Sequence, residues 1–154
     1  MRLILSGYTD AQDIIAGIND AGMAVGFCAK YASGVSLGVR AVRWAPGGAA
    51  VTELGLLPGV NTAALSGSEA RGINQVGTSV GYSISSAGTS IHATIWPGIT
   101  GGLTALDLNS LLPAGSAWTL EYADGISDTG FITGTGSVDP DGVGGTPAYK
   151  QSYT

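Results

Sequence analysis

The chain has 154 residues, of which 44% are hydrophobic and 11% are charged, and its formal net charge is −5. This length fits one domain with a real core, and the hydrophobic content excludes a disordered chain. The acidic balance disfavours nucleic-acid partners, and no apolar run approaches the roughly 20 residues of a membrane-spanning helix. The 26 glycines, with Ser, Thr, Val and Ala in short runs, predict many short strands joined by tight turns.

Residues 1–5 are short and apolar, and they predict a first strand. The most informative motif follows at 16–26, AGINDAGMAVG, and returns as RGINQVGTSVG at 71–81 and, more weakly, as DGISDTGFITG at 124–134. Its first glycine is Gly17, Gly72 or Gly125, so the copies begin 55 and 53 residues apart. Self-similarity at a fixed period of this size predicts three copies of one repeat unit.

Each copy of the motif has the composition of a hairpin. Asn19-Asp20-Ala21-Gly22 is typical of a tight turn, and residues 23–27 are predicted to leave it as a second strand. Asn19, Asn74 and Ser127 are therefore expected to cap the turns through their side chains rather than to bind a ligand. The single cysteine, Cys28, excludes an internal disulfide and is expected to be a small buried hydrophobe.

The rest of each unit also recurs. A loop is predicted over 30–38, and a strand over 39–44 ends at Trp44 with a counterpart over 91–96 that ends at Trp96. The third counterpart is predicted at 147–149, where Ala148 aligns with Ala93 and the tryptophan is absent. A fourth strand over 51–59 is matched by 106–113, and residues 1–5 fill this place for the third unit. Residues 1–154 thus form a single repeat domain with units at approximately 6–58, 59–113, and 114–154 plus 1–5.

Three motifs follow one another along the chain in the order A-x-G-I-N-D-x-G-x-x-V-G, H-A-x-x-W and D-L-x-x-L-P. This order resembles the HAF-type probable extracellular repeat of bacterial proteins. The clearest matches are residues 16–26, 92–96 and 107–113, and the family's histidine is replaced by Arg40 in the first unit and by Pro147 in the third. The resemblance implies an extracellular or cell-surface setting and a blade-like unit of four strands, and it implies no catalytic residue. Residues 1–7 lack the apolar length and the small-residue cleavage site of a signal peptide, so either the protein is not exported by that route or the sequence is a mature or trimmed product.

We therefore expect an all-β fold of twelve strands in three β-propeller-like blades. Three blades are fewer than the four or more of a usual closed ring. We accordingly expect a homo-oligomer, with a dimer favoured, in which residues 1–5 complete a blade and leave no unpaired edge. A closed β-trefoil-like fold and a fragment of a longer array are the alternatives.

Convincing catalytic or metal chemistry is not apparent. His92 is the only histidine, and Arg40 takes its place in the first unit, which favours a structural role. Asp139 and Asp141 lie in a Gly-rich loop, where a plain turn is favoured over a calcium loop. We expect no metal, no cofactor and no catalytic residue, although Asp20 and Asp128 occupy aligned positions.

Aromatic residues are the better candidates for recognition. Trp44 and Trp96 recur once per unit and are expected in the core, whereas Trp118 follows a loop and is the candidate for an exposed anchor. Tyr122 and Tyr149 could frame a shallow apolar patch with Tyr153. The candidate binding residues are therefore Trp118, Tyr122 and Tyr149.

The favoured function is a non-enzymatic extracellular binding module for glycans or cell-surface proteins, without membrane insertion. A self-assembling structural subunit and a propeller-type hydrolase or lyase are the alternatives. Function is expected in the features that the copies do not share, which are residues 30–38, Trp118 and residues 139–146.

Overall fold

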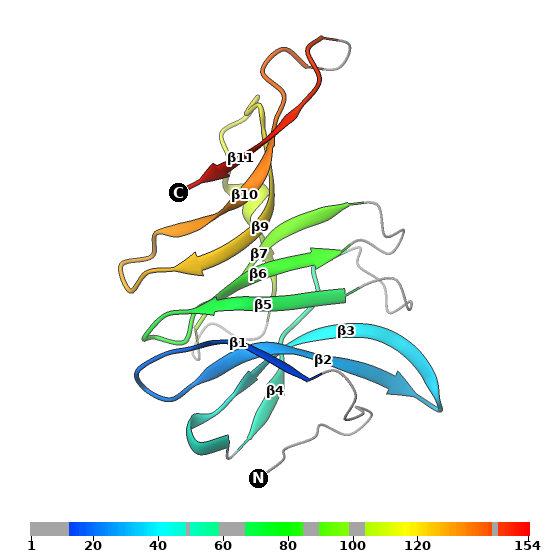
Figure 1. The fold of residues 1–154 in the computed structure, drawn as a ribbon, viewed down its shortest axis with the longest axis vertical. Helices are drawn as coiled ribbons and strands as arrows, with labels where there is room; N and C mark the ends of the chain where they lie inside the picture. The colour runs from blue at the N-terminus through cyan, green and yellow to red at the C-terminus, as the bar shows by residue number, and fades with distance from the viewer. Residues whose placement is uncertain (1–12, 49, 59–66, 85–89, 99–103, 143–144) are drawn as a thin grey trace.

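The computed structural model describes residues 13–48, 50–58, 67–84, 90–98, 104–142 and 145–154, which form an all-β fold (Figure 1). The expectation of twelve strands is wrong, because these residues form eleven. The expected twelfth strand, at 1–5, lies outside the described residues. The eleven strands make two open sheets.

The elements follow one another with short connections. The strands are β1 Ile14–Ile18, β2 Ala24–Ala32, β3 Val35–Trp44, β4 Val51–Glu53, β5 Gly67–Ile73, β6 Ser79–Ile84, β7 Ile91–Trp96, β8 Leu106–Asp107, β9 Trp118–Ile126, β10 Ile132–Val138 and β11 Tyr149–Tyr153. Two short 3-10 helices are η2 Pro46–Gly48 and η3 Leu108–Leu111. We call β1–β4 the first unit, β5–β8 the second unit and β9–β11 the third unit.

Neighbouring strands within each unit pair antiparallel. The first and second units share an eight-stranded sheet of order β1-β2-β3-β5-β6-β7-β8, in which β4 pairs with β3, and the third unit is a separate sheet of order β11-β10-β9. The first two units join through one parallel pair, Val39 with Gly67. In Figure 1 the three units follow one another along the long axis, with β4 of the first unit near the bottom and β11 near the top.

The first strand of each unit carries a one-residue bulge at the same point of its pairing. The bulged residue is Ala16 in β1, Arg71 in β5 and Asp124 in β9. A bulge of this kind locally bends a strand and strengthens its twist. We use the bulge as a common reference point. Residues of different units are called equivalent when they lie the same number of paired positions from the bulge.

The turns that follow these strands are capped by side chains, as predicted. The backbone N–H of Asn19 donates to the Met23 carbonyl at 3.0 Å, while the side-chain Oδ1 of Asn19 accepts from the backbone N–H of Met23 at 2.9 Å. Asn74 makes the same two contacts with Thr78 at 3.0 and 2.9 Å. In the third unit the hydroxyl of Ser127 takes the place of the asparagine side chain.

The same asparagines also connect one unit to the next. Asn19 Nδ2 donates to the Asn74 carbonyl at 2.8 Å, and Asn74 Nδ2 donates to the Ser127 carbonyl at 3.4 Å. The backbones approach closely here, since a Cβ added at Gly72 would lie 3.1 Å from the Cα of Gly125. Glycine is favoured at this place because a side chain would require the backbones of the two units to shift by a few tenths of an ångström.

The hydrophobic core lies between the units. One cluster joins the first and second units and contains Val25, Ala41, Leu54, Leu57, Ala70, Trp96 and Ala105. A second joins the second and third units and contains Val80, Ala93, Leu108, Leu120 and Ala123. Trp96 is fully buried and its indole donates to the Gly55 carbonyl at 2.7 Å, which confirms its predicted core role. Trp44 is only half-buried, beside a smaller cluster that includes the buried Cys28.

The prediction of a loop over 30–38 is wrong. β2 continues to Ala32 and β3 begins at Val35, so only Ser33 and Gly34 connect them. Both have positive φ, at 49° and 79°. Two consecutive residues of positive φ match the twist of a tight hairpin, which is why the strands extend this far.

The predicted alignment of the third unit is also wrong. Ala41 and Ala93 lie opposite Phe27 and Tyr82, whereas the equivalent position in the third unit pairs Ser152 with Thr135. Ser152, and not Ala148, is therefore the counterpart of Ala93. The same register makes Gln151, and not Pro147, the counterpart of His92. Backbone pairing sets the register, and the connection before β11 absorbs the additional residues.

Candidate functional site

An apolar groove opens between the second and third units. Its volume is about 390 Å³, and it is lined by Leu112, Trp118, Leu120, Tyr153 and Thr154. Leu112 follows η3 of the second unit, and the other four belong to, or directly follow, the strands of the third unit. The ring centroids of Trp118 and Tyr153 are 6.2 Å apart with an edge-to-face angle of 79°. Aromatic pairs favour such a geometry, so the two rings form a fixed apolar wall.

A glycine in β10 explains how the ring of Tyr153 reaches across to β9. Trp118 begins β9 and Tyr153 ends β11, and β10 lies between the two strands. Tyr153 pairs with Gly134 of β10, where an added Cβ would lie 2.7 Å from the tyrosine Oη. The absence of a side chain at this glycine therefore lets the tyrosine ring lie across the strand.

The polar group of Tyr153 is used inside the protein. Its hydroxyl donates to the Tyr122 carbonyl at 2.7 Å. Burial, followed by the charge of Asp124, raises the pKa of Tyr153 to about 12, so the phenol stays protonated at neutral pH. The groove thus presents ring carbons and leucine methyl groups rather than a free hydroxyl of this tyrosine.

The three candidate binding residues are not brought together. Trp118 lies half-buried in the groove wall, whereas Tyr149 is 51% exposed on β11 and does not line the groove. Tyr122 packs edge to face on Tyr82, with ring centroids 5.0 Å apart. Arg71 lies over both of these tyrosine rings, with its guanidinium carbon 4.8 and 4.9 Å from the centroids.

The arginine in this cluster is held by an ion pair. Arg71 Nη1 lies 2.5 Å from Asp124 Oδ1, so the pair connects the second and third units. Burial disfavours the charge of Arg71, but Asp124 outweighs this effect and raises its pKa. The ring of Tyr122 is therefore committed to a cation–π contact inside the protein.

Sequence reasoning did not assign Leu112 and Leu120 to a site, and it assigned Tyr153 only to a patch with Tyr122 and Tyr149. Leucines in a hydrophobic chain carry no site signal of their own. What could have indicated the groove is the pairing of the chain's last tyrosine with a glycine, which frees space for its ring. That pairing depends on a register that the motif comparison misplaced.

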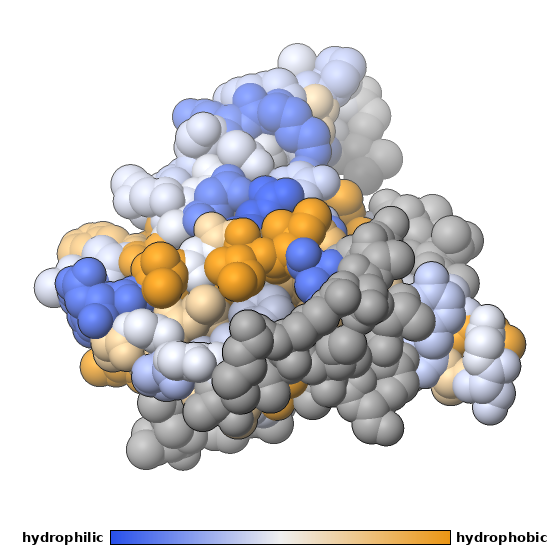
Figure 2. Space-filling view, turned by 60° about the horizontal axis from the view of Figure 1, so that its bottom comes forward, coloured by the Kyte–Doolittle hydropathy of each residue, from blue (hydrophilic) through white to orange (hydrophobic). Residues whose placement is uncertain are grey.

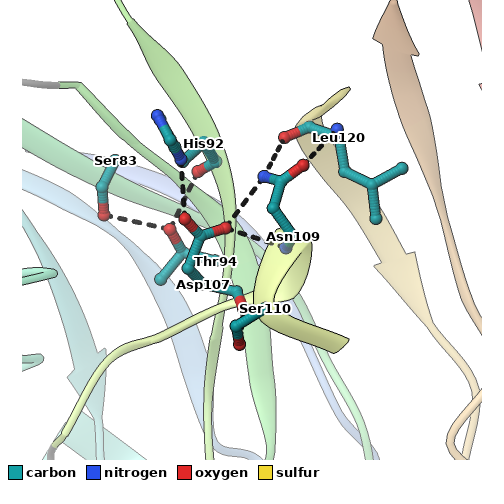
Figure 3. A network of polar contacts seen from close by, with 7 residues as sticks. All are labelled: Ser83, His92, Thr94, Asp107, Asn109, Ser110 and Leu120. Atoms are coloured by element: carbon teal, nitrogen blue, oxygen red, sulfur yellow. Dashed lines mark hydrogen bonds and ion pairs between the residues drawn. The ribbon is translucent and has the colours of Figure 1, made fainter. Parts of the chain in front are cut away.

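A second polar cluster surrounds the only histidine (Figure 3). His92 Nδ1 lies 2.7 Å from Asp107 Oδ2, and Thr94 Oγ1 donates to the His92 carbonyl at 2.9 Å and lies 3.1 Å from Ser83 Oγ. Ser83 and Thr94 are 1% and 0% exposed. A nucleophilic hydroxyl must meet its substrate, and these two hydroxyls are closed off from solvent.

The other oxygen of the aspartate supports the backbone. Asp107 Oδ1 accepts from the Asn109 backbone N–H at 2.9 Å and from Asn109 Nδ2 at 2.8 Å. The Asn109 side chain also bonds both the N–H and the carbonyl of Leu120 in β9 (Figure 3). The position equivalent to His92 is Arg40, which lies 3.5 Å from Glu53. A basic and an acidic side chain thus pair between β3 and β4 in the first unit and between β7 and β8 in the second. Such a recurrence is expected of a structural contact.

Three of the four remaining acidic candidates, all but Asp20, accept hydrogen bonds from backbone amides. Asp139 accepts from the Gly142 amide, Asp141 from the Thr146 amide, and Asp128 from the Gln75 amide at 2.8 Å. Among the described residues no group of three or more His, Cys, Asp or Glu could hold a metal ion. Within the same ranges no helix has the length and apolarity to cross a membrane.

Comparison with known proteins gives no relative from which a site could be transferred. No family model, no curated protein and no solved structure matches the chain.

Proposed function

We propose that the chain is a non-enzymatic binding module built from three copies of a blade-like β unit, and that it acts in an extracellular setting. The repeat is supported by the bulge at equivalent positions of β1, β5 and β9, and by turns with the same capping bonds. Contacts across units that join residues 53 or 55 positions apart support it as well. The extracellular setting rests on the resemblance of the motif to the HAF-type repeat.

The groove between Leu112, Trp118 and Tyr153 carries the binding proposal. In the first interface between units, the fully buried Trp96 contributes to the core. In the second interface a volume of about 390 Å³ lies between Leu112, Trp118 and Tyr153. An apolar concavity with aromatic walls on a rigid β scaffold is typical of a recognition site.

The chemistry of the lining favours a protein ligand that inserts one large apolar side chain. The phenol of Tyr153 already donates to Tyr122, and the other walls are two leucine side chains, the indole of Trp118 and Thr154 at the edge of the described chain. A sugar needs several hydrogen-bonding partners around its ring as well as an apolar face. Hot spots of protein interfaces instead combine an aromatic anchor with a pocket that excludes water.

A non-enzymatic role is supported by the environment of the only histidine. The hydroxyls of Ser83 and Thr94 in its polar network are buried, and Asp107, which pairs with His92, also holds the start of η3 through Asn109. Replacing His92 with Gln is therefore expected to alter stability and to leave ligand binding by the groove unchanged.

The test is selection from a displayed random-peptide library on the full chain, with a glycan array in parallel. Peptides with a large apolar anchor are expected to be enriched. The change Trp118→Ala should weaken their binding by about 30-fold or more, the scale of a truncated aromatic hot spot of roughly 2 kcal/mol. Tyr149→Ala, which removes an exposed aromatic outside the groove, is the matched control and should change affinity less than about two-fold.

Calorimetry and thermal melting of each variant separate a lost contact from a lost fold. Trp118→Phe keeps an apolar wall and should recover part of the affinity. Equal binding of the selected peptides by wild type and Trp118→Ala would refute the assignment of the groove. Binding of glycans alone would refute the assignment of a protein ligand.

A further inference from the structure

The outer face of the first unit is apolar and open. Ile15 and Ile18 of β1 are 65% and 70% exposed, among the highest values for large hydrophobic residues in the described part of the chain. They line a groove of about 320 Å³ together with Ala24 and the half-buried Trp44. Figure 2 brings this end of the molecule forward and shows apolar side chains gathered on it. Contiguous exposed apolar surface of this kind marks an interaction site.

Equivalent positions in the other two units are covered by a neighbouring unit. The counterparts of Ile15 are Ala70 and Ala123, and both are fully buried. Trp44 corresponds to Trp96, which is fully buried as well. The counterparts of Ile18, which are Ile73 and Ile126, pack against the two inter-unit clusters. The open face is therefore the side that this protein elsewhere buries against a second β unit.

The opposite end of the same chain does not complement this face. In the third unit Thr133 occupies the place of Val25, and Ser152 that of Ala41. Both third-unit residues are exposed, whereas Val25 and Ala41 are 0% exposed. A polar outer face of this type is expected where a unit meets solvent. Stacking it on the isoleucines of another copy would bury polar groups without partners.

The shape of the open face also opposes the same stacking. Ile15 carries three more carbon atoms than the alanine that fills the equivalent place in both internal interfaces. Added volume in a tightly packed contact costs about 1–3 kcal/mol. A head-to-tail neighbour would therefore meet both a clash and a mismatch of polarity.

We propose that this outer face binds the same face of a second copy of the chain, which gives a two-fold dimer centred on Ile15 and Ile18. An isologous contact matches apolar surface with apolar surface and closes after two copies, whereas a head-to-tail contact would continue into filaments. The surface differs from the strand exchange by residues 1–5 that the sequence suggests. It is also independent of the groove at Trp118, so failure of one proposal leaves the other standing.

The first experiment measures mass against concentration for the full chain by sedimentation velocity. Wild type should sediment as a dimer at about 100 µM, within the micromolar affinity range of contacts of this class. Ile18→Glu should raise the dimer dissociation constant at least ten-fold, because it places a charge in each half of the contact. Val76→Glu is the matched control, since Val76 is an aliphatic residue 66% exposed in a turn of the second unit. It should leave the mass unchanged.

Near-ultraviolet circular dichroism and thermal melting check that Ile18→Glu remains folded, as expected for a side chain that is 70% exposed. Spin labels then test the symmetry in a Cys28→Ser background. Labels on Ala21→Cys, in the first-unit turn, should give one short distance between copies, and labels on Thr129→Cys, in the third-unit turn, should give none. The proposal would be overturned if wild type were a monomer at all concentrations or formed filaments, or if Ile18→Glu left the mass unchanged. A short distance between a label at position 21 of one copy and a label at position 129 of another would overturn it as well.

Discussion

The contact from Asn19 to the second unit offers a direct measurement of how strongly the units are coupled. Asn19 is 9% exposed and makes two separable side-chain bonds, one from Oδ1 that caps its own turn and one from Nδ2 to the Asn74 carbonyl. Asn19→Ser keeps a capping oxygen, as Ser127 does in the third unit, and removes only the bond to the second unit. Asn19→Ala removes both.

The expected magnitudes follow from what each change leaves unpaired. In Asn19→Ser the Asn74 carbonyl still accepts from the Gly77 amide at 3.0 Å, so the loss is the net value of one hydrogen bond, about 1 kcal/mol. In Asn19→Ala the amide of Met23, a residue only 6% exposed, also loses its side-chain acceptor. An unsatisfied buried donor costs a further 1–3 kcal/mol or so, which brings the total to roughly 2–4 kcal/mol.

Urea unfolding followed by tryptophan fluorescence, with an unchanged m-value as the check on the denatured state, measures these differences. Ser127→Ala is the matched control, because the exposed Ser127 caps a turn whose amide can bond to water, and it should cost about 0.5 kcal/mol or less. The reasoning fails if Asn19→Ser is as stable as wild type within about 0.5 kcal/mol. The bond between units would then contribute nothing, and the whole effect of Asn19→Ala would come from the cap.

Three further outcomes are expected. Trp96→Phe should lower the free energy of unfolding by about 1–3 kcal/mol in urea titration, because it leaves a cavity and an unpaired Gly55 carbonyl. Burial raises the pKa of Cys28 to about 12, so iodoacetamide at pH 8 should modify the native thiol at least about 100-fold more slowly than the urea-unfolded thiol, as followed by mass spectrometry. Burial disfavours the charged form of Glu121, but Lys150 and the hydroxyl of Ser137 outweigh this effect and lower the pKa of the carboxyl. The ionised Glu121 therefore stabilises the fold fully above the unfolded pKa of about 4.3, and this contribution is lost as the pH falls through the lower pKa of the folded state. Glu121→Gln should therefore flatten the acid limb of stability against pH, and an unchanged limb would contradict the assignment.

The features that the sequence predicts well are those with local causes. The capped turns follow from one asparagine or serine and one glycine within five residues, and the structure gives all three of them the same bonds. The core position of Trp96 and the burial of Cys28 follow from apolar neighbours on both sides. Each of these needs no knowledge of how distant segments pack.

The features that it predicts poorly depend on pairing between distant residues. Ala148 matches Ala93 by letter, but the backbone register places Ser152 there, because the connection before β11 holds more residues than its counterparts. Residues 30–38 look like a loop by composition, yet Ser33 and Gly34 can take positive φ and allow two strands to continue almost to the turn. The groove at Trp118 exists only because the second and third units pack as they do.

Differences between the copies of the motif have a simpler explanation than function at most positions. An asparagine stands at 19 and 74, where the next unit offers a carbonyl to its side chain, and a serine stands at 127, which is exposed. The buried Val25 likewise gives way to the exposed Thr133. These substitutions follow the neighbour that each position faces, so they need no ligand. Trp118 is different, because it lies on the covered side of the third unit and yet lines an open groove, and this departure from the pattern is the observation behind the proposed binding site.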